Sequence, residues 1–106
     1  MKRLSLNYFP FEENEKKKLI VREYEAPDEG DEDEVITDET GTFGPSDEYG
    51  ADEVICSDGE KRTVIFVDVV WKEVADKDTM VKYAKALLKG VLRTWADEVE
   101  RLEATE

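Results

Sequence analysis

The apolar positions of the first 25 residues follow the two-residue period of a half-buried strand. In residues 3–9 the apolar side chains fall mainly on one side and the polar ones on the other. Residues 19–25 form a second β-rich stretch, and the polar residues 12–18 lie between the two. The pattern predicts a β-hairpin. The apolar side of its first strand consists of Leu4, Leu6 and Tyr8.

The longest apolar stretch of the chain, residues 62–71, predicts a strand in the middle of a sheet. Its side chains are apolar on both sides, which is typical of a strand that is covered above and below. The dipeptide Asp58-Gly59 separates it from a shorter apolar stretch at residues 53–56. Because Asp-Gly is a strong turn signal, we expect a second hairpin here.

Asp68 interrupts this apolar strand. A buried carboxylate without a partner is costly, so its position needs an explanation. The sequence leaves three roles open: an ion pair with a cation such as Lys72 or Arg22, a place at an uncovered end of the sheet, or an acid in a catalytic site.

The C-terminal part of the chain has the three- and four-residue spacing of an amphipathic helix. Asp76 or Asp78 can cap its N-terminus, and the helix is expected to run to about Ala104. Its apolar stripe consists of Met80, Ala84, Leu87, Leu88, Val91, Trp95, Val99 and Leu102. A basic stripe on the opposite side either faces solvent or contacts the acidic segment of a second copy. It consists of Lys82, Lys85, Lys89 and Arg93.

These elements predict an α+β fold, with an antiparallel sheet of four or five strands and one long C-terminal helix packed on one face. A chain of 106 residues has room for a single domain, residues 1–106, with an acidic and partly irregular segment at residues 26–53. The chain has one cysteine, Cys56, and no apolar run long enough for a signal peptide or a membrane span. We therefore expect a cytoplasmic protein.

The net charge of −13 is concentrated in one part of the chain. Residues 23–60 contain sixteen Asp and Glu residues and no Lys or Arg, whereas residues 1–22 sum to +3 and residues 61–106 to zero. A general requirement, such as solubility in high salt, would spread acids over every exposed element. The local concentration points to a surface for a basic partner.

An extended acidic segment can present its carboxylates in regular rows. Residues i and i+2 of a strand project to the same side about 6.6–6.8 Å apart, and Asp31 with Asp33, or Glu32 with Glu34, have this spacing. Phe43 and Tyr49 are apolar side chains that a purely solvating segment would not need, and we expect them to order the segment or to make contacts. The predicted partner-binding acids are Asp28, Glu29, Asp31, Glu32, Asp33, Glu34, Asp38, Glu39, Asp47, Glu48, Asp52 and Glu53.

The composition argues against several chemistries. Without histidine, the chain lacks the usual general base, the usual zinc ligand and the ordinary hydrolase triads. No stretch combines the Asp-x-Asp-x-Asp-Gly pattern with a glutamate at the twelfth position of a calcium loop. We therefore expect no catalytic residues, no metal and no cofactor. The net charge also disfavours direct binding of nucleic acid or of a membrane surface.

A small chain with acids concentrated beside a near-neutral α+β core resembles the DNA-mimic inhibitors that phages and mobile elements carry against host defence. This class includes anti-restriction and some anti-CRISPR proteins. The resemblance is one of composition over roughly residues 23–60. It implies that carboxylates occupy the basic channel of a CRISPR effector, a restriction effector or another nucleic-acid-binding protein in a bacterial host cell. Such proteins grip DNA mainly through Lys and Arg aimed at phosphates.

Other interpretations stay open. The acidic segment can be a solvated loop that keeps a phage or bacterial structural or assembly protein soluble, while the sheet edge and the helix make the interface. The chain can also be an acidic adaptor or chaperone for a basic protein. The sequence does not decide between a monomer and a homodimer.

Overall fold

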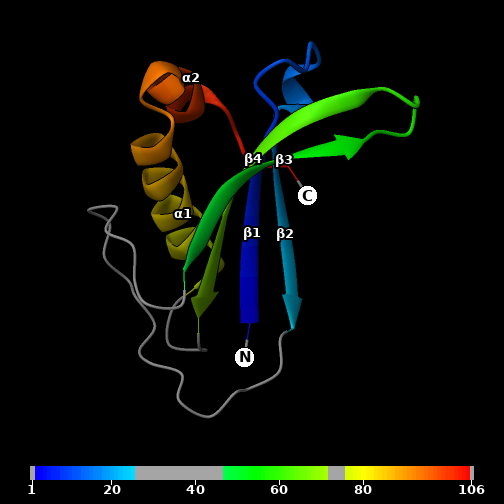
Figure 1. Cartoon of the computed structure of the whole chain (residues 1–106). Helices are drawn as coiled ribbons and strands as arrows, with labels where there is room; N and C mark the ends of the chain where they lie inside the picture. The colour runs from blue at the N-terminus through cyan, green and yellow to red at the C-terminus, as the bar shows by residue number, and fades with distance from the viewer. Residues whose placement is uncertain (1, 26–46, 72–75, 106) are drawn as a thin grey trace.

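A computed structural model describes residues 2–25, 47–71 and 76–105 of the chain (Figure 1). The strands are β1 (Lys2–Tyr8), β2 (Leu19–Glu25), β3 (Glu48–Ile55) and β4 (Lys61–Trp71). The helices are α1 (Lys77–Val91) and α2 (Ala96–Arg101), with short 3-10 turns η1 (Glu15–Lys17) and η2 (Arg93–Trp95).

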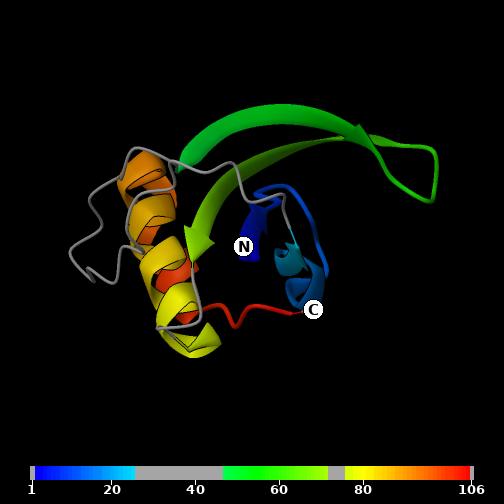
Figure 2. The same cartoon turned by 90° about the horizontal axis from the view of Figure 1, so that it is seen from below.

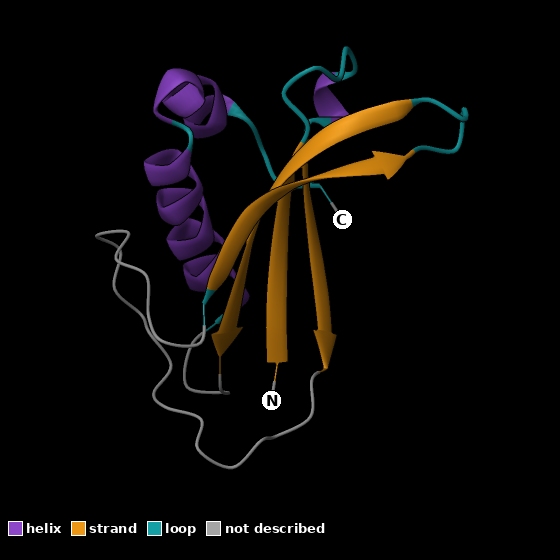
Figure 3. Ribbon diagram, viewed as in Figure 1, coloured by secondary structure: helices purple, strands orange, loops and turns teal. Residues whose placement is uncertain are grey.

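The four strands form one antiparallel sheet in the order β2-β1-β4-β3, with α1 against one face (Figure 3). β1 pairs with β2 on one side and with β4 on the other. The α+β class and both predicted hairpins are confirmed. At the tip of the second hairpin Gly59 has a φ of 81°, the left-handed conformation that favours glycine.

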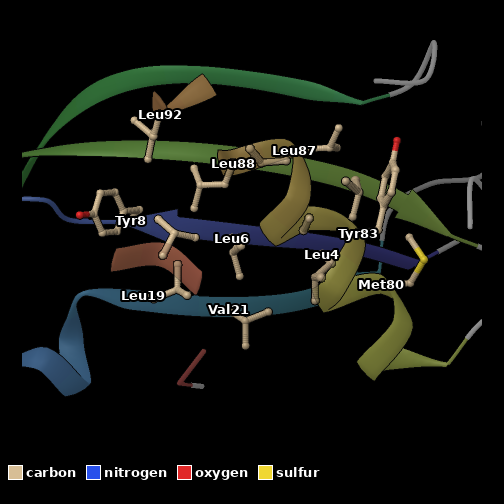
Figure 4. Close-up of a cluster of buried hydrophobic side chains, with 14 of the residues drawn as sticks. Leu4, Leu6, Tyr8, Leu19, Val21, Met80, Tyr83, Leu87, Leu88 and Leu92 are labelled. Atoms are coloured by element: carbon tan, nitrogen blue, oxygen red, sulfur yellow. The ribbon is translucent and has the colours of Figure 1, made fainter. Parts of the chain in front are cut away.

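The core lies between α1 and the face of the sheet that it covers (Figure 4). Leu4, Leu6 and Tyr8 of β1 are fully buried and alternate with less buried residues, because successive side chains of a strand point to opposite faces. The C-terminal part of the chain meets them mainly with the predicted stripe, of which Val91 and Trp95 are only partly buried. Tyr83 and Leu92 are buried although they were not part of that stripe. The buried residues are Met80, Tyr83, Ala84, Leu87, Leu88, Leu92, Val99 and Leu102.

The opposite face of the sheet, which we call the outer face, carries no helix among the described residues. β4 was expected to be covered on both sides, and its outer-face residues Val64 and Val70 are indeed buried. Part of that cover comes from within the sheet. A Cβ added to Gly50 on β3 would lie 3.1 Å from the ring of Phe66, so the glycine lets this ring lie against the neighbouring strand.

The predicted single C-terminal helix is instead divided. Asp76 caps α1, since its side chain accepts a hydrogen bond of 2.7 Å from the Thr79 N–H. α1 ends at Val91, and Leu92 leaves the helical conformation with φ −111° and ψ 61°. A helix of 15 residues is about 22 Å long and a seven-residue strand about 23 Å. A straight continuation would carry Val99 and Leu102 past the end of the sheet, whereas the break returns them to the core.

The strand before the Asp58-Gly59 turn begins earlier than the apolar stretch at residues 53–56 indicated. Residues 48–53, which are part of the segment expected to be partly irregular, belong to β3, which pairs with β4 from Glu48 to Ile55. The remaining residues of that segment, apart from Asp47, lie outside the described ranges. β4 supplies the reason for the difference, because its eleven residues offer backbone partners well beyond the short apolar stretch at residues 53–55.

A polar cluster joins α2 to the β1–β2 hairpin at the end of the core. Glu98 accepts hydrogen bonds from the Tyr8 hydroxyl and, at 2.7 Å, from Lys18 Nζ. Lys18, followed by Tyr8, holds the pKa of Glu98 below its ordinary value. Burial, together with the hydrogen bond to Glu98, raises the pKa of Tyr8. The cluster fixes the returned α2 against the sheet.

The end of the chain covers part of one sheet edge. The Thr105 N–H donates to the Leu19 carbonyl at 2.9 Å, and the Val21 N–H donates to the Thr105 carbonyl at 3.0 Å. The outer edge of β2 is therefore capped over these residues. Within the described ranges, neither helix has the length and apolarity needed to cross a membrane.

Leu6→Ala tests the core. Leu6 is fully buried on the strand that is paired on both sides, so we expect the free energy of unfolding to fall by about 2–5 kcal/mol. Urea titration followed by circular dichroism measures this change. Thr94→Ala, at an exposed position, is the control and should be near neutral. Equal effects of the two substitutions would contradict the described core.

Glu98→Gln tests the polar cluster through its pH dependence. Because the pKa of Glu98 is lowered in the folded state, its contribution to stability is present above the ordinary value of 4.5 and is lost as the pH falls through the folded-state pKa. The variant should therefore lose less stability than the unmodified protein between about pH 5 and pH 3. Urea midpoints across this range provide the measurement. Glu103→Gln, an exposed change of the same charge, should leave the pH dependence as it is.

Candidate acidic interaction surface

The described residues include five of the predicted contact residues: Asp47, Glu48, Tyr49, Asp52 and Glu53. They lie on β3 or directly before it, and Tyr49 is 58% exposed. The remaining predicted residues lie outside the described ranges. These are Asp28, Glu29, Asp31, Glu32, Asp33, Glu34, Asp38, Glu39 and Phe43.

The four described acids do not form a single row. Glu48 and Asp52 are paired with Asp68 and Val64 and point to the outer face. Asp47 and Glu53 have the opposite parity and point to the other side of the strand. The four described acids therefore lie on two sides of the strand, because β3 is regular and its side chains alternate.

Asp47 has a structural contact. Its carboxylate accepts a hydrogen bond of 2.6 Å from the hydroxyl of Tyr83, whose side chain is buried on α1. This contact ties the start of β3 to the helix across the edge of the core. Changing Asp47 would therefore disturb the fold as well as the surface charge.

Asp68 and Glu48 face each other on neighbouring strands. They are directly paired in the β3–β4 register, so both carboxylates lie on the outer face. Like charges in this position destabilise a sheet. One carboxylate oxygen of Asp68, Oδ1, is buried and has no hydrogen-bond partner among the described residues. The fold thus keeps two acids together where neither the pairing nor the burial favours them.

The predicted ion pair between Asp68 and Arg22 is not formed. Both residues are paired with Ser5 of β1, one from each side, so two strand spacings of about 4.8 Å each separate their backbones. The other proposed partner, Lys72, lies outside the described ranges. The register does not place Asp68 at an end of the sheet either, because its partner Ser5 is the middle residue of β1.

The pKa of Tyr24, on β2, is affected by this negative charge. Partial burial, followed by the charge of Asp68 and a smaller effect of Glu48, raises the pKa of Tyr24, while Arg3 opposes the shift. The carboxylates thus act electrostatically on a residue at the opposite edge of the sheet. The acids of the outer face lie on β3 and β4, whereas its cations lie on β1 and β2, as Arg3 and Arg22, and near the start of β4, as Arg62.

The far end of the β3–β4 hairpin extends past the rest of the sheet. β4 pairs with β1 only from Ile65 onward, so residues 52–64 form a two-stranded arm. The tip of this arm projects away from α1, beyond β1 and β2 (Figures 1 and 2). Arg62 supports it through ion pairs with Asp58 at 2.7 Å and with Glu12 of the β1–β2 loop at 3.6 Å.

A cleft of about 620 Å³ lies between the arm and the β1–β2 hairpin. Phe9 and Ile20 line it on one side and Val54 and Val64 on the other, with the half-buried Cys56 at the turn. Hydrogen bonds to the Cys56 side chain and to Asp58 raise the pKa of Arg62. The cation that lines the cleft thus already has acidic partners.

The basic stripe of α1 is partly used within the chain. Lys85 Nζ donates to the Leu102 carbonyl at 2.7 Å, and Lys89 pairs with Glu100 of α2. Lys82 and Arg93 are exposed. Lys85 and Lys89 thus hold the segment that follows the helix break against α1. This role was not among the two predicted for the stripe.

The described residues contain no group of three or more side chains placed to bind a metal ion. The feature that sequence reasoning missed is the pairing of Glu48 with Asp68. A signal for it existed. Once the Asp58-Gly59 turn sets Ile55 opposite Lys61, counting back along a regular hairpin places residue 48 opposite residue 68.

Glu48→Lys tests the cost of this pair. The substitution turns two like charges on neighbouring strands into opposite charges, so we expect stability to rise by about 0.2–1 kcal/mol. Glu53→Lys is the matched control, because it makes the same charge change on the same strand but faces Thr63 on the other side. Urea midpoints measured at low salt compare the two. Equal shifts would mean that relief of overall charge, and not this pair, accounts for the gain.

The chain and its fold were compared with known proteins in three ways. No family model matches the chain, no curated protein matches it, and no solved structure matches its fold. The candidate surface is therefore interpreted from its own residues.

Proposed function

We propose that the protein is a non-enzymatic inhibitor whose carboxylate-rich surface occupies the basic nucleic-acid-binding site of a host defence protein or another nucleic-acid-processing protein. The observation that carries this proposal is the Glu48–Asp68 pair, in which one buried oxygen of Asp68 has no hydrogen-bond partner among the described residues. A sheet does not gain stability from two facing carboxylates, whereas a surface that receives Lys or Arg side chains does gain affinity from them.

The position of the acidic segment supports the same proposal. Residues 26–46 contain eight acids and no cations, and they connect the end of β2 to the start of β3. These are the two edge strands of the sheet, so the segment is attached to the folded domain at both ends. Glu48 and Asp68 continue its charge onto the sheet, whereas Glu23 is paired with Lys2 and Lys77.

A mimic must offer negative charge at a density comparable to that of nucleic acid. Duplex DNA presents one charge per about 1.7 Å of its axis, and its binding proteins meet it with Lys and Arg. Sixteen acids within 38 residues give the chain the charge that such a surface needs. The remainder of the chain is near neutral, so the net charge comes from residues 23–60.

An assembly role is the second candidate, and the exposed Ile55 at the end of β3 favours it. This side chain is 72% exposed, and the arm that carries it projects from the body of the sheet. An assembly protein would lose its interaction when exposed residues at the edge of β3 are changed. It would keep the interaction when Asp31, Glu32, Asp33 and Glu34 are changed.

Charge reversal of Asp31, Glu32, Asp33 and Glu34 to Lys tests the proposed function. Immobilised protein is used to capture partners from a bacterial lysate at low salt, and duplex DNA or RNA is then added at constant ionic strength. Mimicry predicts that nucleic acid releases the partner, that binding weakens steeply as salt rises, and that the quadruple variant captures at least tenfold less.

A second quadruple variant controls for net charge. Reversal of Glu13, Asp78, Asp97 and Glu103 makes the same change at exposed positions outside the acidic segment. It should retain capture and release. If nucleic acid fails to release the partner, or if both variants bind as the unmodified protein does, the mimicry proposal is wrong.

A further inference from the structure

The two edge strands of the sheet differ in how far their outer edges are covered by other parts of the described chain. Thr105 pairs with the outer edge of β2 at Leu19 and Val21. On β3, the outer edge from Ala51 to Ile55 has no strand beside it in the described part of the chain. A long unpaired edge is a template for another extended chain, and most proteins cover, shorten or charge such an edge.

The register identifies the backbone groups that this edge offers. The Cys56 N–H donates to the Glu60 carbonyl at 2.9 Å, so these two residues bond across the hairpin. Because such bonds recur at every second residue of an antiparallel pair, Val54 and Asp52 also bond to β4. The N–H and C=O groups of Ala51, Glu53 and Ile55 therefore point outward.

One of these outward donors is already occupied. The Glu53 N–H donates to the Asp52 carboxylate at 2.8 Å, which agrees with its outward direction. The N–H groups of Ala51 and Ile55 have no such acceptor among the described residues. A shallow depression of about 440 Å³, lined by Ala51, Asp52, Glu53 and Thr63, lies along this edge.

The charges of β3 select the kind of chain that fits. Residues 48–55 contain three acids and no Lys or Arg. A second copy aligned on this edge would bring acids to acids, which disfavours self-pairing. An extended segment with two adjacent basic residues would place one beside Asp52 and the other beside Glu53, on the two faces of the enlarged sheet. Apolar residues next to them would meet Val54 and Ile55.

We propose that β3 binds a basic extended segment of a partner protein, which adds as an antiparallel strand to the edge formed by Ala51–Ile55. Backbone hydrogen bonds hold the segment, and Asp52 and Glu53 select its charge. This inference describes how a basic partner is held, and to that extent it rests on the proposed function. The strand-addition test below uses a peptide and is independent of that function.

The probe is the synthetic peptide Thr-Val-Val-Lys-Lys-Thr-Thr, with a fluorophore at its N-terminus. Two control peptides replace both lysines by glutamate or carry N-methyl groups on alternate residues of the edge that would face β3. Fluorescence anisotropy should show saturable binding of the probe. Each control peptide should bind at least tenfold more weakly, because one loses the charge match and the other the hydrogen bonds.

Ala51→Pro removes one outward N–H and keeps the hydrogen bonds between β3 and β4. Edge strands tolerate proline at positions whose N–H points outward. We expect Ala51→Pro to weaken binding at least tenfold, while Ala51→Thr, which keeps the N–H, binds as the unmodified protein does. Amide exchange of the unmodified protein provides a second measurement that does not depend on the variant's folding. The probe should slow exchange at Ala51 and Ile55 and leave the already bonded amides of Asp52 and Val54 unchanged.

Several results would overturn the inference. These are equal binding of the N-methylated and unmodified peptides, unchanged exchange at Ala51 and Ile55, or self-association through this edge that Ala51→Pro abolishes in sedimentation experiments. The two proposals can fail separately. If the peptide binds at the edge but nucleic acid does not release a cellular partner, the mimicry proposal alone is wrong. If nucleic acid releases the partner from the Ala51→Pro variant as it does from the unmodified protein, the strand-addition proposal alone is wrong.

Discussion

The packing of α1 on one face of the sheet is the contact on which the rest of the structure depends. Leu4 and Leu6 of β1 are fully buried beneath Leu87 and Leu88, and β1 is paired on both sides. With a single helical layer in the described chain, this face supplies most of the buried apolar area. The outer face and the edge of β3 are thereby released from core packing and can carry charge.

The outer face shows how that freedom is used. Glu48 opposes Asp68 on β4, and one oxygen of Asp68 is buried without a hydrogen bond in the described chain. Places where a fold accepts such a local cost are expected to be functional sites, since selection for stability alone would remove them. The same reasoning applies to Ile55, which is exposed at the end of an arm that Arg62 ties to the β1–β2 loop.

Regular periodicity made much of the fold predictable. Residues 19–25 were expected as a strand and form β2 with the same boundaries. The Asp58-Gly59 turn, the β1–β2 hairpin and the cap at Asp76 also follow from local signals. The helix break at Leu92 was not predictable from its apolar stripe, because the stripe continues through it. Only the length of the sheet shows that a straight helix would leave the core.

For the candidate site, the sequence by itself determined the amount of negative charge and its confinement to residues 23–60. Composition is a sum over residues, so it needs no coordinates. The tertiary structure decided which acids share a surface: it separates Glu48 from Asp47 by strand alternation and brings Glu48 to Asp68 across the hairpin. It also leaves the edge of β3 open while Thr105 closes that of β2. Strand pairing joins residues that are far apart in the chain: counting back from the Asp58-Gly59 turn places Glu48 opposite Asp68 only if both strands stay regular over that length, and the structure shows that they do.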